Sequence, residues 1–233
     1  MTPLRGCYGF AMAPRPFERP ATVALPEGPD GALVLDGLHV PHPEAIGGAV
    51  IAPPHPLYGG SMESPVVTEI AKACEHAGLE SLRFNWRGVG ASAGRATGDP
   101  AAAVADYAAA LDWIEETASG PITACGYSFG AATAVRAVAG RPRVRSLLLV
   151  APPPAMLDRA LLEGFAGRLA VAVGQLDELA PAKDLEGMLE SIPGARLEVI
   201  PDADHFFMSA LPAVGRVARA LLGARAGGSR SAV

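Results

Sequence analysis

Ala124-Cys125-Gly126-Tyr127-Ser128-Phe129-Gly130 carries the strongest structural signal in this chain, between a strand-like run at 120–123 and a helix-like run at 131–139. A Gly-x-Ser-x-Gly pattern between a strand and a helix is typical of a nucleophile elbow. The chain must turn within about one residue, which strains the backbone of the residue at the apex. Residues two positions either side then approach each other, so glycine is favoured at both. Ser128 is predicted to project above the sheet, where free N–H groups of the following helix favour negative charge.

The composition is that of a globular protein with ample material for a core. The chain has 233 residues, of which 50% are hydrophobic and 18% are charged, enough for one large domain or two small ones. The net charge of −5 gives no basic footprint for nucleic acid or an anionic membrane. The three cysteines include no Cys-x-x-Cys spacing, so a disulfide framework or a structural zinc site is not expected.

The length of the apolar runs bears on the location of the protein. No run reaches the roughly 18 residues that a membrane span needs, and no signal peptide is evident at the N-terminus. We therefore expect a cytoplasmic protein with no membrane span and no nucleic-acid partner.

Three segments are predicted along the chain. Irregularly spaced prolines indicate an irregular N-terminal arm at 1–19, and small polar residues indicate a frayed tail at 224–233. Between them, residues 20–223 form a single domain. It is expected to begin with a hairpin of two short strands at 21–25 and 32–35.

Strands and helices are predicted to alternate from residue 48 onward. The expected strands lie at 48–52, 82–85, 120–123, 146–151, 169–174 and 196–200, and the expected helices at 65–78, 100–118, 131–139, 182–191 and 207–222. This alternation predicts a mainly parallel sheet with helices on both faces. Ligands of such sheets bind beyond the carboxyl ends of the strands. The loops expected at that edge are 55–60, 87–94, 126–130, 175–178 and 202–205.

A serine hydroxyl needs a base within hydrogen-bond reach to become a nucleophile. Of the five histidines, His205 follows the last predicted strand at the carboxyl edge and is the best candidate. His55 lies at the same edge, but it begins the loop that is needed for another role. The others are expected in a helix or in a loop far from this edge: His39, His42 and His76.

The base needs an acid that orients it and stabilises its charged form. Asp177 follows the strand at 169–174, so the chain order of the three residues is Ser128, Asp177, His205, which is one of the known orders of such triads. The alternatives are the neighbouring carboxylates Glu178, Asp202 and Asp204. The last two are more simply interpreted as turn residues before the final helix.

The reaction also needs hydrogen-bond donors for a developing oxyanion. One donor is expected to be the N–H of Phe129, the residue after the nucleophile, and the other an N–H from the loop after the strand at 48–52. Pro56 has no N–H, so Leu57 or Tyr58 must supply it, and Leu57 is preferred.

Taken together, these motifs resemble the α/β-hydrolase superfamily, and more narrowly a group of small, lidless bacterial α/β-hydrolases of mostly unassigned substrate. The stretches that carry the resemblance are His55-Pro56-Leu57-Tyr58-Gly59-Gly60-Ser61-Met62, Arg83-Phe84-Asn85-Trp86-Arg87-Gly88-Val89-Gly90-Ala91-Ser92, the elbow, Gly174-Gln175-Leu176-Asp177-Glu178 and Asp204-His205-Phe206-Phe207.

The resemblance covers about residues 20–223 and implies an α/β fold with an eight-stranded sheet whose second strand is antiparallel. Only about residues 152–168 are available where many relatives carry a lid, so no full lid domain is expected. The site should be open, with a substrate pocket bordered by four side chains: Tyr58, Trp86, Met156 and Phe206. The sequence departs from the group at Pro53, where a histidine is common, and at Trp86, where phenylalanine is common.

We expect a serine hydrolase that cleaves an ester, thioester or related acyl bond of a small-molecule substrate through an acyl-enzyme. Nothing in the sequence calls for a metal or an organic cofactor. Two alternatives stay open: the same triad used by an acyltransferase, cyclase or peptidase, and a non-catalytic binding module. The final helix or an edge strand could also form a homodimer.

Overall fold

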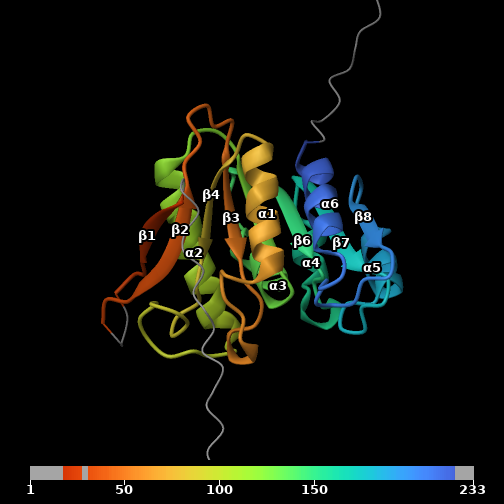
Figure 1. The fold of residues 1–233 in the computed structure, drawn as a ribbon, viewed down its shortest axis with the longest axis horizontal. Coiled ribbons are helices and arrows are strands. Elements are labelled where there is room, and N and C mark those ends of the chain that lie inside the picture. Colours follow the sequence, from red (N-terminus) through yellow and green to blue (C-terminus); the bar gives the residue numbers. More distant parts are fainter. Residues whose placement is uncertain (1–17, 28–30, 224–233) are drawn as a thin grey trace, which may run out of the picture.

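A mixed eight-stranded sheet forms the centre of the molecule (Figure 1). The computed structural model describes residues 18–27 and 31–223, so the predictions for 1–17 and 224–233 lie outside the described residues. The strands are β1 Arg19–Ala24, β2 Val34–Val40, β3 Gly48–Ala52, β4 Glu80–Phe84, β5 Ile122–Tyr127, β6 Val144–Val150, β7 Arg168–Gly174 and β8 Arg196–Ile200. Their order across the sheet is β1-β2-β4-β3-β5-β6-β7-β8.

The strand directions confirm the predicted sheet. β1 and β2 form the expected hairpin, and β2 is antiparallel to both of its neighbours. All pairs from β4 to β8 are parallel. The carboxyl ends of the parallel strands therefore share one edge of the sheet, the lower edge in Figure 1, and the loops that follow them lie together there.

Helices cover both faces of the sheet, as expected. They are α1 Pro65–His76, α2 Pro100–Thr117, α3 Phe129–Ala137, α4 Arg159–Glu163, α5 Ala182–Leu189 and α6 Leu211–Gly223, with short 3₁₀ turns η1 Pro56–Tyr58 and η2 Pro154–Met156. α1 packs against α6 on one face, and α2 packs against α3 on the other (Figure 1). Between β6 and β7 the chain forms only η2 and α4, so no lid domain is present there.

The centre of the sheet is apolar on both sides. Every residue of β3 and of β5 is buried, which is the pattern of strands covered by helices on both faces. Tyr107 of α2 reaches this layer, and its hydroxyl donates to the carbonyl oxygens of Val50 and Cys125 at 3.2 and 2.8 Å. Burial raises the pKa of Tyr107 well above its usual value, so the phenol stays a donor.

The final helix starts later than predicted. It begins at Leu211 rather than Phe207, because Phe207 has a φ of 55°, which is left-handed and does not belong in a right-handed helix. The carboxylate of Asp204 accepts the N–H groups of Phe206 and Phe207, each at 3.0 Å. The segment before α6 is therefore a turn, and this turn carries His205.

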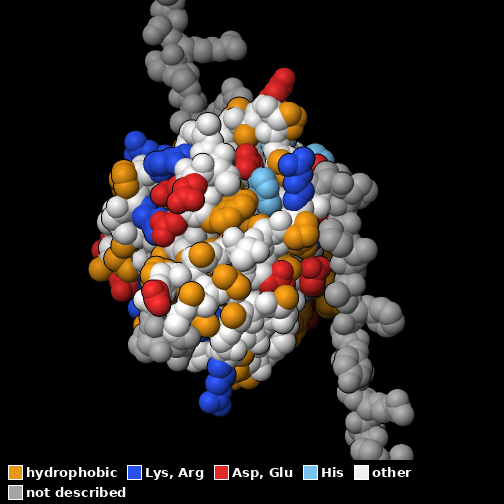
Figure 2. Space-filling view, turned by 90° about the vertical axis from the view of Figure 1, so that its left-hand side faces the viewer, with side chains coloured by type: hydrophobic (Ala, Val, Ile, Leu, Met, Phe, Trp, Pro, Cys, Tyr) orange, Lys and Arg blue, Asp and Glu red, His pale blue; other side chains and the backbone are white. Residues whose placement is uncertain are grey.

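The surface near β1 carries charges of both signs. Figure 2 shows acidic and basic side chains interspersed on this side of the molecule, without a broad patch of one sign. No helix in the described part of the chain combines the length and the hydropathy that a transmembrane span requires.

Candidate active site

Ser128 occupies a strained turn between β5 and α3. Its backbone has φ 55° and ψ −118°, and its N–H donates to the carbonyl oxygen of Val150 at 2.8 Å. A Cβ atom at Gly126 would collide with the backbone of Gly130, and one at Gly130 with the carbonyl oxygen of Pro53. The two glycines of the motif are thus required by close backbone contacts, as the pattern predicts.

The structure brings the three residues of the predicted triad into one hydrogen-bonded chain. The Oγ atom of Ser128 lies 2.9 Å from Nε2 of His205. The Nδ1 atom of His205 lies 2.8 and 2.9 Å from the two carboxylate oxygens of Asp177. His205 and Asp177 are buried, at 7% and 4% exposure. A buried carboxylate beside Nδ1 fixes the neutral tautomer in which Nε2 can accept the serine proton.

The alternative acids lie elsewhere or hold the backbone. Glu178 is exposed, whereas Oδ1 of Asp177 also accepts the N–H groups of Leu179 and Ala180 at 2.9 and 2.7 Å. Asp204 accepts the N–H groups of its own turn, as its interpretation as a turn residue implies. Asp177 is therefore the carboxylate that contacts His205.

Tyr127 contacts both the backbone and the ring of His205, and no role was predicted for it from the sequence. Its hydroxyl donates to the backbone carbonyl oxygen of His205 at 2.8 Å. Its ring packs against those of His205 and Phe207, with centroids 5.7 and 6.3 Å apart. Burial raises the pKa of Tyr127, and the carboxylates of Asp177 and Asp204 raise it further, so the phenol keeps its proton. The sequence shows a tyrosine beside the nucleophile, but not that it meets a residue 78 positions away.

The loop after β3 engages both of the N–H groups that were considered as the second oxyanion donor. The N–H of Leu57 donates to Nδ1 of His55 at 3.2 Å, and the N–H of Tyr58 to the carbonyl oxygen of His55 at 3.1 Å. Within the described residues, the N–H of His55 itself makes no hydrogen bond. The His55 ring lies 4.7 Å from the ring of Phe129, which places this loop beside the elbow.

The four predicted pocket residues fall into different environments. Tyr58 is 88% exposed and Phe206 is 62% exposed; the Phe206 ring lies 5.7 Å from that of His205. Met156 is half-buried on η2. Trp86 differs from the expectation, because it is only 1% exposed and does not border an open surface.

Trp86 instead supports the site from within the core. Its Nε1–H donates to the carbonyl oxygens of Pro53 and Pro54 at 3.2 and 3.0 Å, and its ring packs against that of Phe129 at 5.6 Å. A large ring with a single donor is well suited to such a buried position once the donor is satisfied. Trp86 thus contacts both the elbow and the start of the loop that follows β3, called the β3 loop below.

Comparison with known proteins shows the family. Residues 57–187 match the family described as serine aminopeptidase, S33. This chain belongs to that family. An uncharacterised protein of Rickettsia prowazekii is 30% identical over 175 residues, which are 68% of this chain and 71% of that protein.

Solved structures agree with the family match. An α/β serine hydrolase homologue from Coxiella burnetii is 31% identical with a TM-score of 0.73, and the match covers 86% of this chain and 96% of that one. A lidless α/β serine hydrolase from Xanthomonas campestris is 28% identical with a TM-score of 0.72, over 87% and 93% of the two chains. The chain is therefore an α/β-hydrolase of the lidless type, as the resemblance implied.

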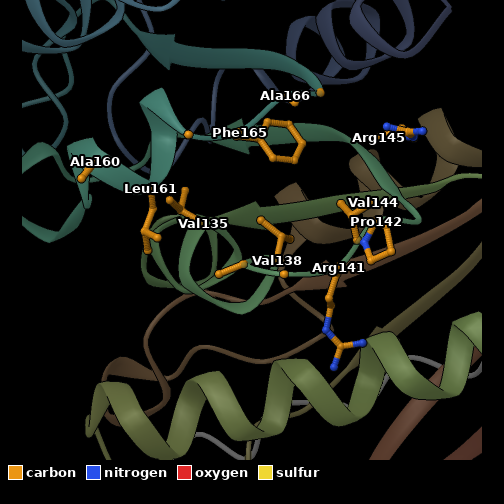
Figure 3. A pocket seen from close by; sticks show the side chains of 14 residues that line it. Val135, Val138, Arg141, Pro142, Val144, Arg145, Ala160, Leu161, Phe165 and Ala166 are labelled. Carbon is orange, nitrogen blue, oxygen red and sulfur yellow. The ribbon is translucent and has the colours of Figure 1, made fainter.

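Two hollows flank α3 in this hydrolase. One, of about 220 Å³, begins at Phe129, the residue after Ser128; it is lined by Pro100, Phe129, Ala132, Thr133, Arg136, Ala155 and Met156. The other, of about 560 Å³, lies at the far end of α3 and against α4, where Val135, Val138, Leu161 and Phe165 line it (Figure 3). No residue of the Ser128–His205–Asp177 arrangement lines either hollow, but only the first reaches the elbow.

Other reactive groups do not converge on a second centre. The described residues include no cluster of three or more His, Cys, Asp or Glu side chains that could hold a metal ion. Cys74 and Cys125 are buried free thiols, and a hydrogen bond with Cys74 is the main cause that raises the pKa of Cys125. A cysteine with a raised pKa is a poor nucleophile, so Ser128 is the better candidate although Cys125 is only three positions away.

Proposed function

We propose that this hydrolase is a serine hydrolase that cleaves an ester, thioester or related acyl bond through an acyl-enzyme. The single observation that carries the proposal is the chain of contacts from Ser128 Oγ to His205 Nε2 at 2.9 Å and from His205 Nδ1 to Asp177 at 2.8 Å. A strained serine, a buried histidine and a carboxylate in this order are the parts that nucleophilic acyl transfer needs.

The reaction follows from these contacts in two halves. His205 Nε2 takes the proton of Ser128 as Oγ attacks the acyl carbon, and the carboxylate of Asp177 stabilises the resulting imidazolium. The imidazolium then gives its proton to the leaving oxygen or sulfur, and the bond to the acyl carbon breaks. In the second half, His205 takes a proton from water, the hydroxide attacks the acyl-enzyme, and Ser128 recovers its proton as the acid departs.

Two backbone N–H groups would hold the oxyanion. The N–H of Phe129 is at the N-terminus of α3, where the helix dipole favours negative charge. In the β3 loop we favour the N–H of His55 over those of Leu57 and Tyr58, because those two already donate within the loop. Each donor of this kind supplies about 3 kcal/mol of transition-state stabilisation.

A peptidase is the second candidate, because the matching family is described as serine aminopeptidase. The same triad could also transfer the acyl group to an amine or an alcohol, or close a ring. Product analysis separates these reactions: with an ester substrate, hydrolysis yields the free acid even when an amine or alcohol is present. A peptidase would also release an amino acid from a short peptide.

The proposal is tested by labelling with a fluorophosphonate, which reacts with activated serines. We expect one adduct on Ser128 in the wild type, mapped by intact mass and peptide analysis, and none in Ser128→Ala. Turnover of any ester substrate should fall by several orders of magnitude in Ser128→Ala. A folded wild-type protein that gives no adduct, or a Ser128→Ala variant with unchanged turnover, would overturn the assignment and favour a binding module.

A further inference from the structure

The smaller hollow runs along one face of α3. Four of its lining residues, Phe129, Ala132, Thr133 and Arg136, are spaced i, i+3, i+4, i+7 and thus share one side of the helix. Phe129, which follows the nucleophile, is at one end of this row and Arg136 is at the other. At 1.5 Å per residue the two ends are about 10 Å apart along the helix axis.

The walls of this α3 groove are mostly apolar. Pro100, at the start of α2, lines it together with Ala155 and Met156 of η2. The hydroxyl of Thr133 is turned back to the helix, where it donates to the carbonyl oxygen of Phe129 at 2.9 Å. Between Phe129 and Arg136 the groove therefore offers mainly hydrocarbon surface, which suits an acyl chain.

Arg136 lies at the far end of the groove and has no carboxylate partner among the described residues. It is exposed, and its Nη2 donates to the backbone carbonyl oxygen of Met156 at 3.3 Å. No carboxylate in the described part of the chain forms an ion pair with it. By contrast, Arg87 and Arg141 on the same side of the sheet are each paired with an aspartate, at 2.6 and 2.7 Å. Arg136 is thus available to an anionic ligand.

We propose that the α3 groove binds the acyl part of the substrate, and that this acyl chain carries a carboxylate at its far end. The inference rests on the proposed serine-hydrolase function. The acyl carbonyl would meet the N–H of Phe129, the chain would lie over Ala132, and the carboxylate would meet the guanidinium of Arg136. A planar guanidinium pairs well with a carboxylate in two parallel hydrogen bonds.

The same groove disfavours acyl groups that end in an ammonium group and acyl groups that end in a neutral methyl group. An N-terminal ammonium, as in an aminopeptidase substrate, would find a like charge in Arg136 and no carboxylate among the lining residues. A neutral acyl chain of the same length would gain apolar contact. Its terminal methyl group, however, would displace water from the Arg136 guanidinium and could not replace the lost hydrogen bonds. The preferred substrates are therefore esters or thioesters of which the acid part has a second, free carboxylate.

The test compares pairs of nitrophenyl esters of equal acyl length, one ending in a methyl group and one in a carboxylate. In the wild type we expect kcat/KM to be about tenfold higher for the carboxylate ester at the length that spans the groove, the usual range for a hydrogen-bonded charge. Arg136→Gln should remove this preference, because it lowers kcat/KM for the carboxylate ester about tenfold more than for the methyl ester. Arg136→Lys should restore part of it, and added salt should weaken it.

Two further variants keep the result specific to the groove. Arg145, on the rim of the larger hollow (Figure 3), is also exposed, so Arg145→Gln removes the same charge and should leave the preference intact. Ala155 is exposed, so Ala155→Phe should fill the groove without disturbing the core and lower kcat/KM most for the long esters.

The outcomes separate this inference from the proposed function. If the fluorophosphonate labels Ser128 and the methyl esters are hydrolysed, but the carboxylate esters show no preference or keep it in Arg136→Gln, the groove assignment is wrong. A higher kcat/KM for ammonium-ended esters would also overturn it. If the fluorophosphonate does not label the protein, the proposed function itself fails.

Discussion

The two sides of the active site are built in different ways. On one side, Ser128, His205 and Asp177 come from three separate loops and are joined through polar contacts, of which the His205–Asp177 contact is buried and the Ser128–His205 contact is partly buried. On the other side, the β3 loop is held by hydrogen bonds between its own neighbours, and its Leu57 and Tyr58 side chains are 58% and 88% exposed. The buried side is joined by contacts between distant parts of the chain. On the exposed side, Trp86 holds only the start of the loop, through the carbonyl oxygens of Pro53 and Pro54, and the hydrogen bonds of Leu57 and Tyr58 are local.

This difference assigns separate tasks to the two sides. Buried, cross-linked polar groups keep a fixed geometry, which proton transfer needs. An exposed loop with local hydrogen bonds can change its side chains at little cost to stability. Substitutions on the buried side should therefore change kcat strongly, and substitutions on the exposed side should change KM weakly.

The largest effect in this comparison is expected for Asp177→Asn. An amide beside Nδ1 of His205 favours the wrong tautomer, so kcat should fall by about 10⁴-fold. The amide oxygen can still accept the N–H groups of Leu179 and Ala180, so the fold should persist. The measurement is kcat for a nitrophenyl ester and the rate of fluorophosphonate labelling.

Glu178→Gln is the matched control, since Glu178 is the adjacent but exposed carboxylate. It should leave both rates unchanged. If Glu178→Gln lowered kcat as much as Asp177→Asn, the acid of the triad would be misassigned.

An intermediate effect is expected for Tyr127→Phe. The substitution keeps the ring but removes the hydrogen bond to the carbonyl oxygen of His205, which is worth about 1 kcal/mol. If Tyr127 positions His205, kcat should fall about fivefold, KM should stay the same, and the limb of the pH–rate profile that reports the histidine should move. These kinetic readouts separate positioning from a loss of stability alone.

Tyr107→Phe provides the comparison for Tyr127→Phe. Tyr107 is also buried and also donates to backbone carbonyl oxygens, but those belong to Val50 and Cys125 in the strands. Both variants should lose similar amounts of thermal stability, and only Tyr127→Phe should lose kcat. Equal kcat in the two variants would show that the Tyr127 hydroxyl is merely structural.

The sequence predicts the buried side of the site better than the exposed side, for a physical reason. The elbow, the strand order and the alternation of strands and helices are local or periodic signals, and they place Ser128, Asp177 and His205 at one edge of the sheet. The glycine-rich loop 87–94 is also expected at this edge, but it supplies no residue of the triad. Arg87 anchors this loop through an ion pair with Asp106 at 2.6 Å.

What the sequence does not predict depends on side-chain direction and long-range contact. The position of Trp86 after β4 says nothing about whether its ring enters the core or the pocket. The contact of Tyr127 with His205 joins residues that only the folded sheet brings together. The N–H of Leu57 cannot be known to be engaged until the ring of His55 is placed. The helix α6 starts at Leu211 and not at Phe207, because the spacing of apolar residues does not reveal the left-handed turn at Phe207.

A small effect is expected for Tyr58→Ala on the exposed side. The Tyr58 ring lies 4.7 Å from the ring of His55 and is otherwise open to water. Its removal should raise KM for aromatic or apolar esters a few-fold, consistent with about 1 kcal/mol for an aromatic contact, and leave kcat and thermal stability unchanged. A fall in kcat comparable to that of Asp177→Asn would contradict the division between the two sides.

The smallest effect concerns the pH dependence of the β3 loop. Burial lowers the pKa of His55, and its Nδ1 must be unprotonated to accept the N–H of Leu57. Because the folded-state pKa lies below the ordinary value of about 6.5, the unfolded chain binds this proton first as the pH falls. The contribution of His55 to stability is thus fully present above about pH 6.5 and is lost as the pH falls through the folded-state pKa.

His55→Asn isolates this contribution. An asparagine in the same position can accept the N–H of Leu57 through its side-chain oxygen, as in an Asx turn, but it does not titrate. The thermal midpoint of the variant relative to the wild type should therefore be constant above about pH 6.5 and should shift in favour of the variant at lower pH. A difference that does not depend on pH would mean that the loop survives protonation of His55, and that the hydrogen bond from Leu57 to its ring contributes little to stability.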